Sequence, residues 1–205
     1  MFVGSLEITN DQHNFTIEET THPYHNILTE SFDLPYKHHF YAKTVCSLEE
    51  FVKSSVFSIY TANLLLVSIY NQLHRLSRHH IAISFFDLND ILVIDSRDFY
   101  FCNTDKLYPI SKPNNIITVT QLYDTGNRFL PPEFKSNNKM PLTCHKNTGF
   151  FSLASIVLHC LKHTNQIFST FTTDDILDYY DYTKMSSTLN LCLSDKPENR
   201  HFIIF

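Results

Sequence analysis

Glycine is scarce in this sequence, which contains only Gly4, Gly126 and Gly149 among 205 residues. A loop of the type G-x-G-x-x-G covers phosphate groups because its glycines let backbone amides come close to the phosphate oxygens. Only one glycine precedes residue 126, so no such loop exists upstream of it. A nucleotide site built on glycine-rich backbone is therefore excluded in that part of the chain.

Basic clusters and long apolar runs are missing as well. The formal net charge is −5 without a basic block, so the electrostatic signature of a nucleic-acid partner is absent. No apolar run reaches the length of a membrane span, and no signal peptide follows Met1. Little glycine, no tryptophan and abundant Asn, Ile, Phe and Tyr indicate an AT-rich coding genome, such as that of a virus or a protist. We therefore expect an intracellular protein, cytoplasmic or nuclear, with a virion component as a further option.

Paired cysteines and metal-ligand spacings are also absent. The five cysteines are an odd number without a C-x-x-C motif, which predicts free thiols in a reducing compartment. His159 and His163 have the i, i+4 spacing of helical metal ligands, but the glutamate of H-E-x-x-H and a third ligand are missing. We expect neither a metal nor another cofactor.

What the sequence does contain is a large apolar fraction, 43% hydrophobic and 14% aromatic residues, which predicts a folded chain with a substantial core. Residues 148–163 are apolar on nearly every side of a helical wheel. A helix of that kind is buried, and this one is too short and too polar to span a membrane. We therefore expect it at the centre of the core.

Other segments predict a mixed α+β fold. Alternating residues indicate half-buried strands, capping boxes indicate helix starts, and three- and four-residue apolar steps indicate a long helix. The expected strands are 5–8, 14–18, 40–45, 81–83, 91–94, 98–102 and 116–120, with a turn at 95–98. The expected helices start near residue 47, cover 56–78, run from 172 to about 185, and cover 187–193.

Four motifs, in order, resemble the C-terminal lobe of a protein kinase over residues 46–205. Residues 84–93, SFFDLNDILV, resemble the catalytic loop, and residues 131–133, PPE, resemble the A-P-E element. Residues 149–154, GFFSLA, resemble the start of the buried central helix, and residues 195–200, DKPENR, resemble the late D-P-x-x-R element. The resemblance implies a mainly helical lobe at 46–205, preceded by a reduced, strand-containing N-terminal segment at 1–45.

The same resemblance implies that the reaction machinery is lost. Aligning Asp90 with the catalytic-loop asparagine puts Phe85 where the base aspartate belongs, and a phenyl ring cannot accept a proton. Asn103 falls where the metal-binding aspartate is expected, so a carboxylate becomes an amide. Gly149 replaces the aspartate that holds the catalytic loop. We therefore expect no enzymatic activity.

The resemblance also implies an ion pair between Glu133 and Arg200, which would anchor a loop if it were buried. The alternative is two unrelated surface charges. Asp174, Asp178 and Asp181 would form an acidic strip on the helix that starts at residue 172, opposite an apolar face. Such a strip is either a solvated surface or a docking surface for a basic partner.

These expectations describe a pseudokinase that acts through protein–protein contact, as an adaptor or as a structural component of an assembly. Two alternatives stay open. One is a minimal phosphotransferase in which Asp87 serves as the base and Asp90 with Asp105 holds a cation. The other is a pseudokinase that binds nucleotide without transferring phosphate.

Overall fold

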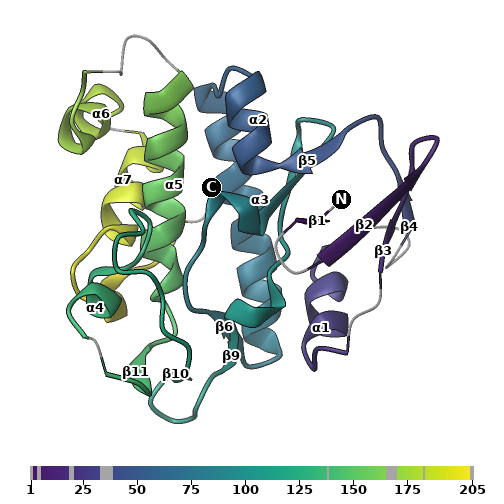
Figure 1. Ribbon diagram of the computed structural model, residues 1–205. Coiled ribbons are helices and arrows are strands. Elements are labelled where there is room, and N and C mark those ends of the chain that lie inside the picture. Colours follow the sequence, from purple (N-terminus) through teal and green to yellow (C-terminus); the bar gives the residue numbers. More distant parts are fainter. Residues whose placement is uncertain are drawn as a thin grey trace.

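The computed structural model describes residues 2–3, 6–18, 21–32, 39–137, 139–164, 170–181 and 183–203. Helices gather around α5 on one side of the molecule, and the strands of the N-terminal segment lie on the other side (Figure 1). Small antiparallel sheets connect these parts. The predicted α+β class is confirmed.

The N-terminal segment is a four-stranded sheet in the order β1-β2-β3-β4. Its strands are β1 (Phe2–Val3), β2 (Leu6–Asp11), β3 (Asn14–Ile17) and β4 (His39–Tyr41), and α1 (His25–Glu30) follows β3. The alternation that predicted these strands buries Leu6 and Ile8 in β2 and Phe15 and Ile17 in β3, and β2 continues past the expected end at residue 8 with exposed residues to Asp11. The buried members join the same core as α3 and α5. The division into domains at residue 45 stays a prediction.

The single strand expected at 40–45 is wrong. The chain forms β4 in the first sheet and β5 (Val45–Ser47) in another, where β5 pairs with β7. Between them the backbone N–H groups of Lys43 and Thr44 donate to the Asp95 carboxylate at 2.7 and 2.9 Å. Because these donors serve a side chain from a distant turn, they do not continue a strand ladder.

Two helices follow and begin at side-chain caps. Ser47 and Glu50 form the predicted capping box of α2 (Leu48–Ser54), and Ser58 caps α3 (Ile59–Arg78) by accepting from the Thr61 amide at 3.1 Å. The helix α3 therefore begins three residues later than the apolar spacing suggested.

Short strands and single turns then build the centre of the fold. They are β6 (Ile81–Ile83), η1 (Leu88–Asp90), β7 (Ile91–Ile94), β8 (Asp98–Phe101), η2 (Thr104–Lys106), β9 (Leu107–Pro109), β10 (Ile116–Val119), α4 (Pro132–Lys135) and β11 (Leu142–His145). The strands β7 and β8 form the predicted hairpin, in which Asp95 and Ser96 take the positive φ of a tight turn. The pairs β6–β9 and β10–β11 are also antiparallel.

The helix α5 (Gly149–Thr164) lies at the centre, between α2 and α3 on one side and α6 and α7 on the other (Figure 1). The predicted buried helix is confirmed. Each fully buried aliphatic side chain contributes about 1.5–3 kcal/mol. The buried apolar side chains of α5 are Leu153, Ala154, Ile156, Val157, Leu158, Cys160 and Leu161.

The C-terminal helices differ from the prediction. The helix α6 (Thr173–Tyr179) starts at the expected capping box but ends before Tyr180. The next helix, α7 (Lys184–Cys192), is capped by Thr183, which accepts from the Ser186 amide at 3.1 Å. Capping by Thr183 starts a new helix, so the boundaries expected near 185 and 187 were wrong. The turn η4 (Pro197–Asn199) follows α7. No helix in the described part of the chain combines the length and the apolarity needed to cross a bilayer.

The start of α5 touches the loop that follows β6. A Cβ atom on Gly149 would lie 2.7 Å from the Ile83 carbonyl oxygen and 3.2 Å from the Phe86 ring. The close approach of the two backbones therefore requires glycine at this position.

We predict that Gly149→Ala lowers the free energy of unfolding by about 1–3 kcal/mol, because the backbone at Ile83 must shift to make room. The matched control is Gly126→Ala, where the added Cβ would meet only the side chain of exposed Asp124, at 3.2 Å. Urea unfolding followed by circular dichroism measures both. Equal stability of the two variants would show that the contact is not tight.

Candidate functional site

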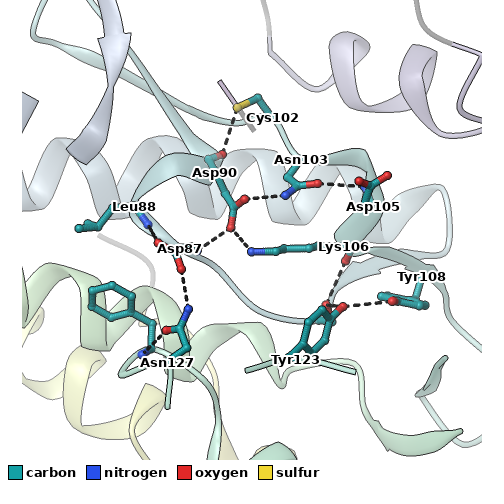
Figure 2. A network of polar contacts seen from close by, with 12 residues as sticks. Asp87, Leu88, Asp90, Cys102, Asn103, Asp105, Lys106, Tyr108, Tyr123 and Asn127 are labelled. Carbon is teal, nitrogen blue, oxygen red and sulfur yellow. Dashed lines mark hydrogen bonds and ion pairs between the residues drawn. The ribbon is translucent and has the colours of Figure 1, made fainter. Parts of the chain in front are cut away.

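A network of polar contacts joins the loop between β6 and β7 to the loop between β8 and β9 (Figure 2). At its centre is the carboxylate of Asp90, a residue that is only 4% exposed. Asn103 donates from Nδ2 to Asp90 Oδ1 at 2.6 Å, and the Asp87 amide donates to Oδ2 at 2.6 Å. The ammonium of Lys106 forms an ion pair with the same Oδ2. Both carboxylate oxygens are therefore occupied.

Side-chain caps at two short 3₁₀ turns hold Asp87, Asp90 and Asn103 in these positions. Asp87 caps η1, its Oδ1 accepts from the Leu88 amide at 2.7 Å, and Asp90 completes the reciprocal capping box. Asn103 caps η2 by accepting from the Asp105 amide at 3.0 Å. Asp and Asn favour such turns because their short side chains bond neighbouring backbone groups. The network is thus encoded largely within two short loops.

The Lys106 ammonium also contacts an aromatic face. Its Nζ lies 3.6 Å from the centroid of the Phe85 ring, which is buried and meets Tyr123 edge-on. The Tyr123 hydroxyl bonds to Ser84 at 2.9 Å and to the Tyr108 hydroxyl at 3.1 Å. A carboxylate and a ring therefore share the positive charge of Lys106 in a largely dry environment.

Titration in this network is dominated by burial. Burial raises the pKa of the Asp90 carboxyl, and the charge and hydrogen bond of Lys106 oppose that shift. Burial also raises the pKa values of Tyr123, Tyr108 and Cys102. An activated nucleophile needs a lowered pKa, so the hydroxyls and the thiol are shifted away from that role.

The structure brings the three sequence-predicted positions Phe85, Asp90 and Asn103 together. Sequence reasoning missed Lys106, although the predicted hairpin held a signal for its neighbourhood. Pairing of Ile91 with Phe101 places Asp90 beside the loop that follows β8, and the Cys102 amide donates to the Asp90 carbonyl at 2.8 Å.

Asp90 and Asp105, suggested together as a cation site, have different partners in the structure. Asp90 is paired with Lys106, whereas the Asp105 carboxylate is 63% exposed and lies 3.9 Å from the His22 ring. Asp87, the candidate base, accepts from the Asn127 amide group at 2.6 Å. Among the described residues no group of three or more His, Cys, Asp or Glu side chains could hold a metal ion.

The expected ion pair between Glu133 and Arg200 is present, and its Glu133 side is partly buried. The guanidinium, which is fully buried, donates to the two carboxylate oxygens at 2.7 and 2.9 Å. It also donates to the carbonyls of Ser194 at 2.7 Å and Asp195 at 3.2 Å, and Thr148 donates its hydroxyl to Glu133. The alternative of two unrelated surface charges is wrong. This bidentate pair fixes the α4 segment to the start of α5 and to the chain end.

The acidic strip is only partly as expected. Asp174 and Asp178 are exposed on α6, opposite the buried Ile176 and Leu177. Asp181 is exposed too, but it follows the end of α6 because the helix stops at Tyr179. The three carboxylates therefore do not share one helix face, and a docking role for them stays a prediction.

The prediction of free thiols is confirmed. No disulfide bond joins any of the five cysteines, Cys46, Cys102, Cys144, Cys160 and Cys192. Burial raises the pKa of each of them, to about 12 for Cys144 and Cys192. A thiol with a raised pKa is a poor nucleophile at neutral pH, which argues against cysteine-based catalysis.

The chain was also compared with known proteins. No protein-family model matches it, and a search of the curated proteins finds no match either. The resemblance to a kinase lobe therefore rests on the four sequence motifs and stays a prediction.

We predict that Glu133→Gln lowers the free energy of unfolding by about 3–5 kcal/mol, because it leaves the buried Arg200 charge without a carboxylate. Lys135→Gln, an exposed change in the same short helix, is the matched control. Chemical unfolding at pH 7 measures both. A loss no larger than that of the control would mean that the pair does not hold the α4 segment.

Proposed function

We propose that this chain is a catalytically inactive, protein-kinase-like domain that acts through protein–protein contact, as an adaptor or as a structural component of an assembly. The observation that carries the proposal is the Asp90 carboxylate, which is buried and bound by Lys106, Asn103 and the Asp87 amide. A carboxylate in that state is not available to a metal-bound nucleotide.

The resemblance to a kinase lobe implies a role for the residues in this contact. Asp90 and Asn103 align with the two residues that hold metal ions in active kinases. Here they are bonded to each other, and the positive charge beside them belongs to Lys106. The lysine supplies in the fold the charge that a metal ion would supply in the reaction, which supports a scaffold that needs no metal.

Contacts that serve packing support the same proposal. Phe85, at the position of the base, is buried beneath the Lys106 ammonium. Gly149, at the position of the anchoring aspartate, lets α5 reach the Ile83 carbonyl directly. Glu133 and Arg200 form the anchoring pair that the resemblance implies. The substitutions thus remove reactive groups and leave close-packed contacts in their places.

Two alternatives stay open, an enzyme and a domain that binds nucleotide without transferring phosphate. A minimal phosphotransferase would use Asp87 and Asp90, yet these side chains are bonded to Asn127 and Lys106. A nucleotide-binding pseudokinase would need a cleft beside the N-terminal sheet. A cavity of about 510 Å³ lies beside that sheet, between Phe15, Val45 and Phe51, and Lys43 is the one cation among the described residues that line it.

We predict that the purified chain transfers no phosphate from Mg²⁺-ATP to itself or to generic protein substrates, and that its melting temperature does not rise with Mg²⁺-ATP. Transfer is followed with radiolabelled ATP, and binding by equilibrium dialysis. Robust autophosphorylation would refute the proposal. Nucleotide binding without transfer would favour the nucleotide-binding alternative.

Substitutions at Asp90 distinguish the proposed inactive domain from the phosphotransferase alternative. We predict that Asp90→Ala lowers the free energy of unfolding by about 3–5 kcal/mol, since the buried Lys106 ammonium loses its partner. Lys106→Met should cost a similar amount by stranding the carboxylate. Asp105→Ala, an exposed acid of the same network, is the control. Urea unfolding measures all three. A phosphotransferase instead predicts that Asp90→Ala folds normally and loses activity.

A further inference from the structure

Two adjoining cavities form a groove next to α5. Their volumes are about 380 and 450 Å³, and they share Arg128, Phe129 and His159 in their linings. We call this the Arg128 groove. The first cavity lies against α5 and α6, and the second lies against α2 and the η1 loop. The groove is thus built from segments far apart in the sequence.

The first cavity has an apolar floor and a cationic rim. Phe129, Leu158 and Ile176 are buried in the floor, whereas Arg128 and Lys162 are exposed at the rim. No Asp or Glu occurs among the described residues that line this cavity. Two positive charges above apolar side chains stand out on a chain with a net charge of −5.

The acidic groups near the groove already have partners. In the second cavity Glu49 is paired with Lys53 at 2.7 Å, and Asp87 accepts from Asn127. Next to the first cavity, Asp175 accepts from the amide and the hydroxyl of Thr172, each at 2.7 Å. These bonds leave Asp87 and Asp175 charged, and the hydrogen bonds from Thr172 together with the charge of Lys162 lower the pKa of Asp175. The described lining of the first cavity itself carries two cations and no acid.

The pKa of His159 is sensitive to the positive charges in the groove. Its Nδ1 lies 3.3 Å from Arg128 Nη1. Burial, the charge of Arg128 and the charge of His163 together lower the pKa of His159 to about 4. The ring is neutral at pH 7, so its contact with Arg128 leaves the guanidinium charge uncompensated.

We propose that the Arg128 groove binds an extended segment of a partner protein that carries an apolar side chain next to Asp or Glu residues. The apolar side chain enters the floor formed by Phe129, Leu158 and Ile176, and the carboxylates meet Arg128 and Lys162. A guanidinium matches the geometry of a carboxylate with two parallel hydrogen bonds. The inference rests on the proposed function, because it names the chemistry of the partner.

Size and charge together favour this occupant. A cavity of a few hundred Å³ with a small number of polar groups at its rim is typical of a specific binding site. The first cavity is of the size that takes one or two side chains. Charged groups at the rim select partners of opposite sign.

The test uses the full chain and a fluorescein-labelled ten-residue peptide with a central Phe flanked by two Asp on each side. Fluorescence polarisation at low and high salt measures binding. We expect Arg128→Gln and Lys162→Gln each to weaken binding about 2–5-fold, and the double variant about tenfold. Replacing the Asp residues of the peptide by Asn, or its Phe by Ser, should weaken binding as much. Arg97→Gln, at the exposed turn after β7, is the matched control and should bind as the unaltered chain does.

Four outcomes would overturn the inference. The acidic peptide does not bind up to roughly millimolar concentration, or it binds the double variant as tightly as the unaltered chain. A peptide with phosphoserine in place of Asp binds while the carboxylate peptide does not. Sedimentation shows a dimer that the double variant abolishes, which would assign the groove to a second copy of the chain. None of these outcomes changes the expected absence of phosphate transfer, so the proposed function is tested separately.

Discussion

The ion pair between Asp90 and Lys106 is the contact on which the centre of this fold depends. A buried carboxylate is tolerated only when charge and hydrogen bonds compensate its lost hydration. Here the compensation ties the loop after β6 to the loop after β8, and the Phe85 ring and Tyr123 extend it to the segment before α4. Under the proposed function, the same contact that supports packing also withholds the carboxylate from a metal-bound nucleotide.

Two further anchors hold α5 in relation to this centre. Arg200 binds Glu133 beside the first turn of α5, and Gly149 lets that turn touch the backbone at Ile83. Because α5 is buried along nearly its whole length, its position fixes the surfaces on both sides, including the Arg128 groove. A scaffold for partner binding needs rigid surfaces of this kind, whereas phosphate transfer needs free carboxylates and a metal ion.

Local patterns predicted much of this structure. Apolar spacing identified α3 and α5, the capping boxes at Ser47 and Thr172 identified helix starts, and alternation identified the first two long strands. Long-range contacts explain the errors. The Asp95 carboxylate divides the strand expected at 40–45, and the Asp90–Lys106 pair joins side chains sixteen residues apart. The groove combines α2, the η1 loop, residues 126–129, α5 and α6, so no single stretch of sequence contains its signal.

The most direct test of the central claim is a Mn²⁺ titration of the chain, with and without ATP, followed by electron paramagnetic resonance and by the amide NMR signals of Asp90 and Asn103. If Lys106 occupies the Asp90 carboxylate, the chain leaves the spectra of free Mn²⁺ and of Mn²⁺-ATP unchanged, and neither amide signal broadens. Bound Mn²⁺ that selectively broadens both signals would show that the carboxylate still holds a cation, and would contradict the account.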